Sequence, residues 1–107
     1  MQTLTRETCV PPTMQNIVVI EELEAQIVQA GENVRTVLAS AGAGFEHVYA
    51  MTTYHVGIQE QLELFCKIKD RYILRTNPPP AWTGVGVTAL TFPGQVVEIQ
   101  VNAYVPA

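Results

Sequence analysis

No apolar run in the sequence approaches the roughly 20 residues that a membrane-spanning helix needs, and the N-terminal MQTLTRETCV lacks the charged-then-apolar pattern of a signal peptide. Cysteine is also scarce. Cys9 and Cys66 are too few and too far apart for a disulfide scaffold or a metal knuckle. We therefore expect a cytoplasmic protein whose two thiols are free and lie buried as small apolar side chains.

Charge is sparse, and positive charge is the rarer sign. Charged residues make up 15% of the chain, the formal net charge is −4, and the six lysines and arginines are scattered. Phosphate binding needs a concentrated basic patch. The charge distribution therefore argues against a nucleic-acid partner and against an anionic membrane surface.

Several motifs that carry chemistry are missing as well. No set of His, Cys and acidic residues has metal-ligand spacing, and no serine lies in a nucleophile elbow. The GVGV segment at 84–87 is too short and too apolar for a loop that cradles phosphate. We expect neither a metal nor another cofactor.

Apolar residues, in contrast, are plentiful. They make up 48% of 107 residues, which is enough for one core but not for two. We expect a single domain over residues 1–107, with extra apolar surface to bury against copies of itself.

Two segments have helical periodicity. Before the first stand acidic residues at 21, 22 and 24, and AGAG at 41–44 ends it; its apolar residues are Leu23, Ile27, Ala30, Val34 and Leu38. The second precedes the prolines at 78–80, and its apolar stripe is Leu62, Phe65, Ile68 and Tyr72.

The remaining segments predict strands. TLTRETCV and NIVVI flank a proline turn, HVYAMTTYHV spans 47–56, and GVGVTAL and QVVEIQVNAYV form a hairpin around TFPG. The order strand, strand, helix, strand, helix, strand, strand favours an α+β fold with two helices on one face of a sheet. The other face needs a cover, which we expect another subunit to supply.

One acidic residue stands apart from the others. Glu98 lies inside VVEIQV and is the only acid after residue 70. Because side chains alternate along a strand, Glu98 shares a face with Gln100 and Asn102. If that face is open to water, Glu98 is an ordinary edge residue. If it faces a cleft between subunits, desolvation would raise its pKa and make it a candidate general acid or base.

Two blocks of the sequence resemble the RidA/YjgF family of reactive-intermediate deaminases. The first is QAGENVRTVL followed by GAGFEHV, and the second combines VGV, a leucine, a Pro-Gly turn and VEI. The resemblance runs from about Pro12 to the C-terminus. It implies a chorismate-mutase-like (ferredoxin-like) fold, a homotrimer, and a small-molecule cleft between neighbouring subunits. It also implies hydrolysis of imines and enamines to ammonia and a keto acid.

The family's site residues are only partly present. The glutamate that positions water in the family corresponds to Glu98, but Trp82 stands where the carboxylate-binding arginine is expected. Thr83 and Gly84 follow it, and Cys66 replaces a helix asparagine. The family's opening strand, with its glycine-proline-tyrosine segment, is missing, so we expect a shortened N-terminal strand region. An indole offers one neutral donor in place of a guanidinium fork.

We therefore expect a divergent family member that acts on a small, uncharged or planar molecule. Glu98 would be the acid or base of a hydrolysis or tautomerisation, and Trp82 and Cys66 would contact the ligand. Thr83 and the backbone amides around Gly84 would donate hydrogen bonds to a developing oxyanion. The other candidate ligand contacts are Val85, Gly86 and Tyr104.

Alternatives stay open at this point. Trp82 either fills the former carboxylate pocket or stacks on a flat ligand. The chain could be an imine deaminase with a relocated arginine, or a trimer that binds ligands or proteins without catalysis; the arginines considered are Arg6, Arg35 and Arg75. His47 is expected in a solvent-facing lead-in to a strand, and His55 is either structural or a partner of Glu98.

Overall fold

The computed structural model describes residues 2–5, 22–73 and 79–106, of which residues 2–5 are described as backbone only. The elements in chain order are β1 (Gln2–Thr5), α1 (Leu23–Ser40), the 3-10 turn η2 (Phe45–His47), β2 (Val48–Val56), α2 (Ile58–Tyr72), β3 (Ala81–Val87) and β4 (Val97–Ala103). The predicted strand NIVVI and most of TLTRETCV lie outside the described residues, as do Cys9, Arg6 and Arg75.

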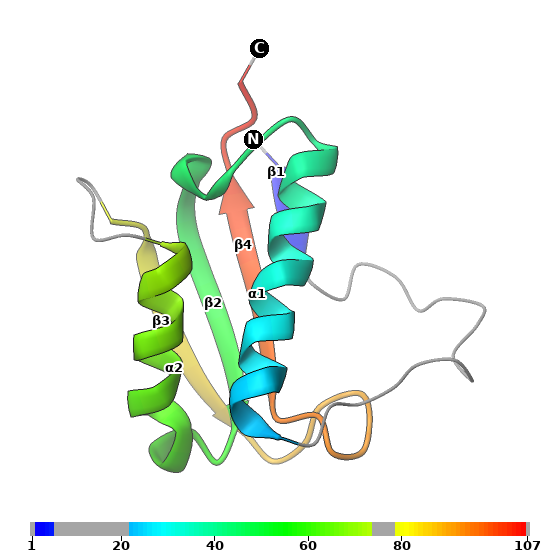
Figure 1. The fold of residues 1–107 in the computed structure, drawn as a ribbon, viewed down its shortest axis with the longest axis vertical. Helices are drawn as coiled ribbons and strands as arrows, with labels where there is room; N and C mark the ends of the chain where they lie inside the picture. Colours follow the sequence, from blue (N-terminus) through cyan, green and yellow to red (C-terminus); the bar gives the residue numbers. More distant parts are fainter. Residues whose placement is uncertain (1, 6–21, 74–78, 107) are drawn as a thin grey trace.

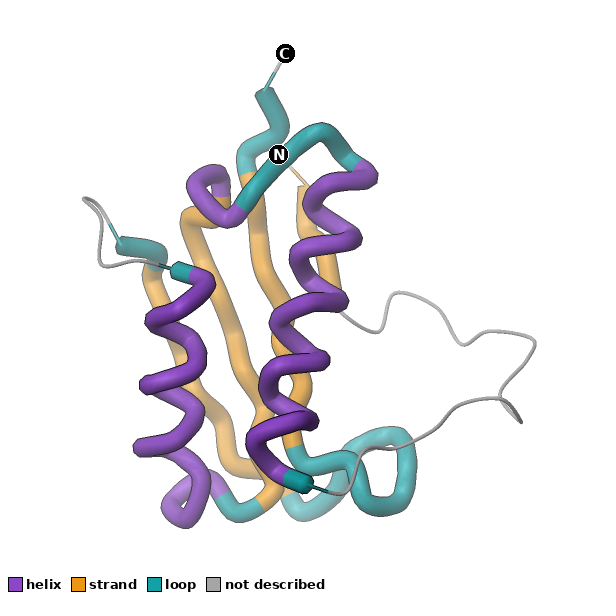
Figure 2. Tube along the Cα trace, in the orientation of Figure 1, coloured by secondary structure: helices purple, strands orange, loops and turns teal. Residues whose placement is uncertain are grey.

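The four strands form one mixed sheet in the order β1-β4-β2-β3. β4 is antiparallel to β1 and to β2, and β3 is parallel to β2. Both helices lie side by side over one face of this sheet (Figures 1 and 2). The predicted α+β class, with two helices covering one face, is therefore confirmed. We call this face the helix face and the opposite one the open face, since no described helix or strand covers it.

The predicted hairpin of the last two strands is wrong, because β2 lies between β3 and β4. A strand, a helix and a second strand in succession favour a parallel β-α-β crossover, and β2, α2 and β3 form one. The chain then passes from β3 to the far side of β2 through residues 88–96. The TFPG segment does turn within this connection, with Gly94 at a φ of 85°.

Helix α1 begins and ends near the predicted positions. The Glu22 carboxylate caps it by accepting from the backbone N–H groups of Glu24 at 3.1 Å and Ala25 at 2.8 Å. Gly42, with a φ of 77°, follows its last turn. The predicted apolar residues Ile27, Ala30, Val34 and Leu38 are all buried in the core, and Leu23 packs against it.

Helix α2 buries a slightly different stripe from the predicted one. Phe65 and Ile68 are in the core as expected, but Leu62 is half-buried and its neighbour Gln61 is only 2% exposed. Burying an amide is favourable only if it is hydrogen-bonded. The Gln61 amide donates to the carbonyl oxygens of Val56 and Val96, both at 3.0 Å, which compensates for its burial.

Strand register fixes which side chains share a face. Across β3, β2 and β4, three rows point to the helix face: Trp82–Met51–Val101, Gly84–Thr53–Ile99 and Gly86–His55–Val97. Three rows alternate with them on the open face: Ala81–Ala50–Asn102, Thr83–Thr52–Gln100 and Val85–Tyr54–Glu98. The predicted alternation of β4 is confirmed, because the helix-face residues Val97, Ile99, Val101 and Ala103 are all buried.

Candidate functional site

Glu98 lies on the open face beside Tyr54, its cross-strand partner on β2. The side chains of both are half-buried. The Tyr54 hydroxyl donates to Gln100 Oε1 at 3.3 Å, so the phenol leans toward the next row, which also holds Thr83. A carboxylate, a phenol, an amide and a hydroxyl therefore gather on one patch of the open face. Such a set can donate and accept protons and can hold polar atoms of a ligand.

A surface concavity adjoins this patch. It is lined by Val56 and by residues 88–96 of the β3–β4 connection. Val56 follows Tyr54 by two residues on β2, so alternation places its side chain on the open face, the side of the Glu98 carboxylate. Gln26 of α1 holds the end of this connection by donating to Gly94 O at 3.2 Å and accepting from the N–H groups of Val96 and Val97.

Trp82 lies on the helix face, at the outer edge of the sheet. Its ring stacks on Phe65 with centroids 5.8 Å apart, and the Lys69 ammonium lies 4.7 Å from the ring centroid. The indole N–H donates to Thr53 Oγ1 at 2.9 Å. Within one chain Trp82 is thus a half-buried packing residue with a satisfied N–H, which fits the first of the two roles considered above.

The two glycines of β3 lie on the same face, under the first turn of α2. A Cβ at Gly86 would lie 3.1 Å from Ile58 Cγ2, and one at Gly84 would lie 3.5 Å from Ile58 Cδ1. The absence of a side chain at Gly86 lets α2 approach β3 closely, whereas a Cβ at Gly84 would meet Ile58 at an ordinary contact distance. Thr83 and Val85 point to the open face, so β3 divides its candidate residues between the two faces.

Trp82 and Glu98 therefore lie on opposite faces of one sheet. The layer of backbone between them prevents both side chains from contacting one small ligand within a single chain. A site that uses both must combine the edge of one subunit, carrying Trp82, with the open face of another, carrying Glu98.

Two further residues belong to the Trp82 edge. Lys69 contacts the indole, and Cys66 precedes it by three residues on α2, so the two share one side of the helix. Cys66 is a half-buried free thiol. This placement is compatible with its predicted role as a ligand contact next to Trp82.

Tyr104 lies away from the open-face patch around Glu98 and away from Trp82. It is 55% exposed and follows the end of β4 opposite to Glu98, where its backbone N–H donates to His47 O at 2.8 Å. Tyr104 is six positions along the chain from Glu98, which corresponds to roughly 20 Å in an extended strand. The structure therefore does not bring Tyr104 to Glu98 within one chain.

The two histidines have different surroundings. His47 directly precedes β2, as predicted, but it belongs to a 3-10 turn and is half-buried. Its Nδ1 accepts from Gly44 N at 2.9 Å. His55 is fully buried on the helix face, so it cannot pair with Glu98 across the sheet. Burial lowers the pKa of His55, and its hydrogen bond to the Gln61 side chain opposes that shift.

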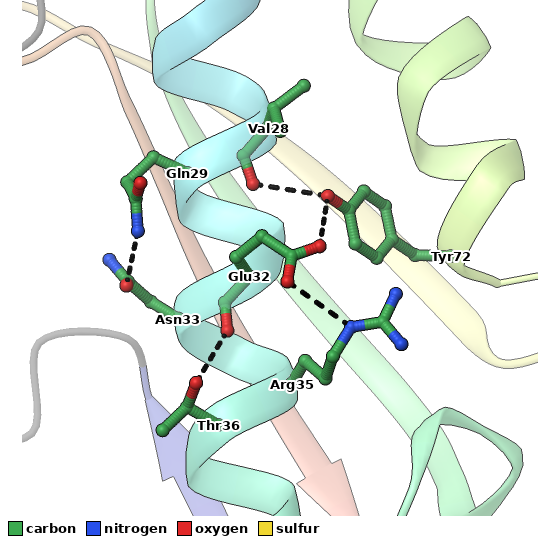
Figure 3. Close-up of polar contacts among 7 residues, drawn as sticks. All are labelled: Val28, Gln29, Glu32, Asn33, Arg35, Thr36 and Tyr72. Carbon is green, nitrogen blue, oxygen red and sulfur yellow. Dashed lines mark hydrogen bonds and ion pairs between the residues drawn. The ribbon is translucent and has the colours of Figure 1, made fainter.

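Arg35 contacts neither the open-face patch around Glu98 nor Trp82 of its own chain. Its Nε lies 3.5 Å from Glu32 Oε1, and its guanidinium lies over the rings of Phe45 and Tyr72. Figure 3 shows Glu32 between Arg35 and the Tyr72 hydroxyl, which also donates to Val28 O at 3.2 Å. This cluster ties α1 to the end of α2. Of the three arginines considered for relocation, Arg35 is the only one among the described residues.

Sequence patterns missed two residues of these patches, Tyr54 and Lys69. The sequence did not show on which face of its strand Tyr54 lies. Only the register with β4 shows that Tyr54 adjoins Glu98. No sequence pattern singled out Lys69, and its contact with Trp82 depends on how α2 crosses β3.

Within the described ranges 2–5, 22–73 and 79–106, no cluster of three or more His, Cys, Asp or Glu residues could hold a metal ion. The same residues include no helix that is both long and apolar enough to cross a membrane.

Comparison with known proteins identifies the family. A family model described as Endoribonuclease L-PSP matches residues 8–105. The chain belongs to the RidA/YjgF/L-PSP family. It is 34% identical over 85 residues to the RutC family protein YjgH of Escherichia coli (strain K12), a match that covers 79% of this chain and 63% of YjgH. The chain thus spans less than two thirds of the length of that curated relative.

Solved structures of RidA/YjgF/L-PSP proteins have the same fold. The structure of YjgH superimposes with a TM-score of 0.76 at 31% identity, covering 84% of this chain and 67% of YjgH. A protein of the conserved Rid family, YyfB from Yersinia pestis, gives a TM-score of 0.73 at 30% identity, covering 96% of this chain and 78% of YyfB. The family resemblance inferred from the two sequence blocks is therefore confirmed.

Proposed function

We propose that the chain forms a homotrimer that binds a small, planar or uncharged molecule at each boundary between subunits. In this proposal Glu98 is the acid or base of a hydrolysis or tautomerisation. The observation that carries it is the placement of Trp82 and Glu98 on opposite faces of one sheet. Family membership makes both positions candidates for one site, and only two chains can bring them together.

The open face supplies the second support. Its residues Glu98, Tyr54 and Thr83 are half-buried or exposed in one chain, and a concavity adjoins them. A neighbouring subunit that covers this face would desolvate the Glu98 carboxylate and raise its pKa toward the range in which it can exchange protons near neutral pH. Thr83 and Tyr54 offer hydroxyl donors to a ligand oxygen on the same side.

Trp82 changes which ligand fits the edge. A guanidinium binds a carboxylate through two charge-assisted hydrogen bonds, whereas the only N–H of the indole already donates to Thr53. What Trp82 can still offer a ligand is an apolar ring surface, which suits a flat molecule.

Lys69 favours a second candidate, the hydrolysis of an imino acid. Its ammonium lies 4.7 Å from the centroid of the Trp82 ring and 3.5 Å from Asp70 Oδ1, so a cation paired with one carboxylate lies at the edge where the family's arginine is replaced. In this candidate Lys69 takes the carboxylate of the substrate, and water adds to the C=N carbon and expels ammonia. A net charge of −4 gives no comparable support to RNA binding, despite the description of the family model.

The decisive experiment compares rates of hydrolysis of 2-iminopropanoate, generated in situ, by wild type, Trp82→Arg, Lys69→Met and Glu98→Gln. Light scattering and circular dichroism would show that each variant keeps its assembly and fold. The proposal predicts an inactive wild type and a gain of activity in Trp82→Arg. That gain should disappear in Trp82→Arg combined with Glu98→Gln.

Other results choose between the candidates. Activity in wild type that Lys69→Met abolishes would establish the second candidate. Activity that persists unchanged in Glu98→Gln would remove Glu98 from the mechanism. Inactivity of every variant, Trp82→Arg included, would leave a trimer that binds ligands without catalysing imine hydrolysis. A monomeric wild type would overturn the site between subunits.

A further inference from the structure

A continuous chain of hydrogen bonds runs inside the helix face from Trp82 to the start of β4. The indole N–H donates to Thr53 Oγ1 at 2.9 Å, and Thr53 Oγ1 lies 2.6 Å from His55 Nε2. On the other side of the imidazole, His55 Nδ1 lies 2.8 Å from Gln61 Oε1. Thr53 and His55 are fully buried, so water does not substitute for any of these contacts.

The donors and acceptors of this chain allow only one arrangement of protons with neutral His55. Gln61 uses its NH₂ group on two backbone carbonyls, so its Oε1 must accept, and His55 Nδ1 must carry the proton. His55 Nε2 is then an acceptor, and the Thr53 hydroxyl donates to it. The Thr53 oxygen in turn accepts from the indole N–H.

The surroundings of His55 favour this neutral form. The ring packs edge-on against Phe65, with centroids 4.7 Å apart, and its strand neighbours are Gly86 on β3 and Val97 on β4. Of the nearby charged groups, Lys69 on α2 contacts the indole and Glu98 on β4 lies across the sheet. Desolvation lowers the pKa of His55, with the Gln61 hydrogen bond acting against it.

Protonation would reverse the direction of the central hydrogen bond. An imidazolium donates from both nitrogens, so Thr53 Oγ1 would have to accept from His55 Nε2 and from the indole together. The Thr53 hydroxyl hydrogen would then have lost its buried acceptor. Rotation of the Thr53 side chain or displacement of the indole would relieve this conflict.

We infer that His55 is a positioning residue for Trp82, acting through the Thr53 hydroxyl, and that protonation of the imidazole releases the indole. The coupling between His55 and Trp82 stands on the contacts alone. Its consequence for ligands rests on the proposed function: a planar molecule that stacks on Trp82 should bind more weakly below neutral pH.

Trp82 is the only tryptophan, so the fluorescence of the chain reports this indole directly. We would record its emission spectrum from about pH 8 to about pH 5, with far-UV circular dichroism on the same samples. The expected result is a change in emission with a midpoint below 6.5, the ordinary pKa of histidine, at constant ellipticity. This midpoint should disappear in His55→Gln.

The second histidine provides a matched control. His47→Gln should keep the wild-type titration, because His47 contacts the Gly44 backbone and not this chain of hydrogen bonds. Thr53→Val removes the hydroxyl with little change in shape. It should shift the emission near neutral pH and make it independent of pH, even if His55→Gln does not fold.

Several outcomes would overturn the inference. A midpoint that persists in His55→Gln or in Thr53→Val would mean that another group or path acts on the indole. A flat wild-type titration would mean that the imidazole does not control it. Emission and ellipticity that change together would make His55 an element of stability only. None of these readouts needs catalysis, so they stand whether or not any imine is hydrolysed.

Discussion

The helix face and the open face are built from alternate residues of the same strands, yet they differ in how far one chain completes them. On the helix face Thr53, His55 and Gln61 are buried with identified hydrogen-bond partners, and apolar side chains surround them. On the open face Glu98 and Tyr54 are only half-buried. The helix face is covered by the folding of one chain, whereas the open face keeps partly exposed polar side chains and area that another molecule can cover.

The largest expected effect contrasts Phe65 of α2, which packs against the helix face, with Tyr54 of the open face. Phe65→Ala should reduce the free energy of unfolding by about 3–5 kcal/mol, because Phe65 is 1% exposed and packs against Trp82 and His55. Tyr54→Ala should cost about 1 kcal/mol or less in the fold of a single chain and should instead weaken assembly. Urea unfolding and light scattering measure the two effects. Equal losses of folding stability would erase the difference between the faces.

A smaller effect is expected from the buried amide. Gln61→Leu should cost about 2–3 kcal/mol, since it leaves the buried His55 Nδ1–H without its acceptor and removes a donor from the Val56 carbonyl. The Val96 carbonyl would keep its hydrogen bond from the Val56 N–H. Gln59→Leu, the same change at an exposed position of α2, is the control and should stay within about 0.5 kcal/mol. Chemical unfolding of both variants would measure these two changes in the free energy of unfolding. A neutral Gln61→Leu would show that packing, not hydrogen bonding, specifies this position.

The smallest effect is the pH dependence that His55 contributes. Because its folded pKa is lowered, the unfolded chain binds more protons at mildly acidic pH. The stabilisation is fully present above 6.5 and is lost as the pH falls toward the folded pKa. The slope cannot exceed about 1.4 kcal/mol per pH unit for one proton. Unfolding titrations should show this slope in wild type and His47→Gln, and a flatter dependence in His55→Gln. An unchanged slope in His55→Gln would mean that other groups cause the pH dependence of the free energy of unfolding.

Local periodicity predicted the elements that depend on it. The 3.6-residue repeat of Ile27, Val34 and Leu38 was sufficient to place α1, and the alternation in β4 was sufficient to separate Glu98 from its buried neighbours. These features depend on neighbours along the chain and on a single buried side. The sequence therefore contains what is needed to infer them.

Features that depend on pairing between distant segments could not be predicted in the same way. Alternation does not say which strand β3 adjoins, so the sequence suggested a hairpin in place of the crossover around α2. Without that register, the opposite orientations of Trp82 and Glu98 could not be recognised. Gln61 was missed for a related reason: its burial depends on His55 and on the carbonyl of Val96, which lies 35 residues further along the chain.

The position of β4 has a consequence for how the chain acquires its structure during synthesis. β4 is the last of the described strands along the sequence, yet it lies in the interior of the sheet, between β1 and β2. Until β4 leaves the ribosome, β1 lacks its partner among the described strands, and β3 is the one described strand with which β2 can pair. The nascent chain can form the β2–α2–β3 unit early, but its hydrophobic core must wait for β4. A truncation within β4 should therefore divide the sheet instead of trimming its edge.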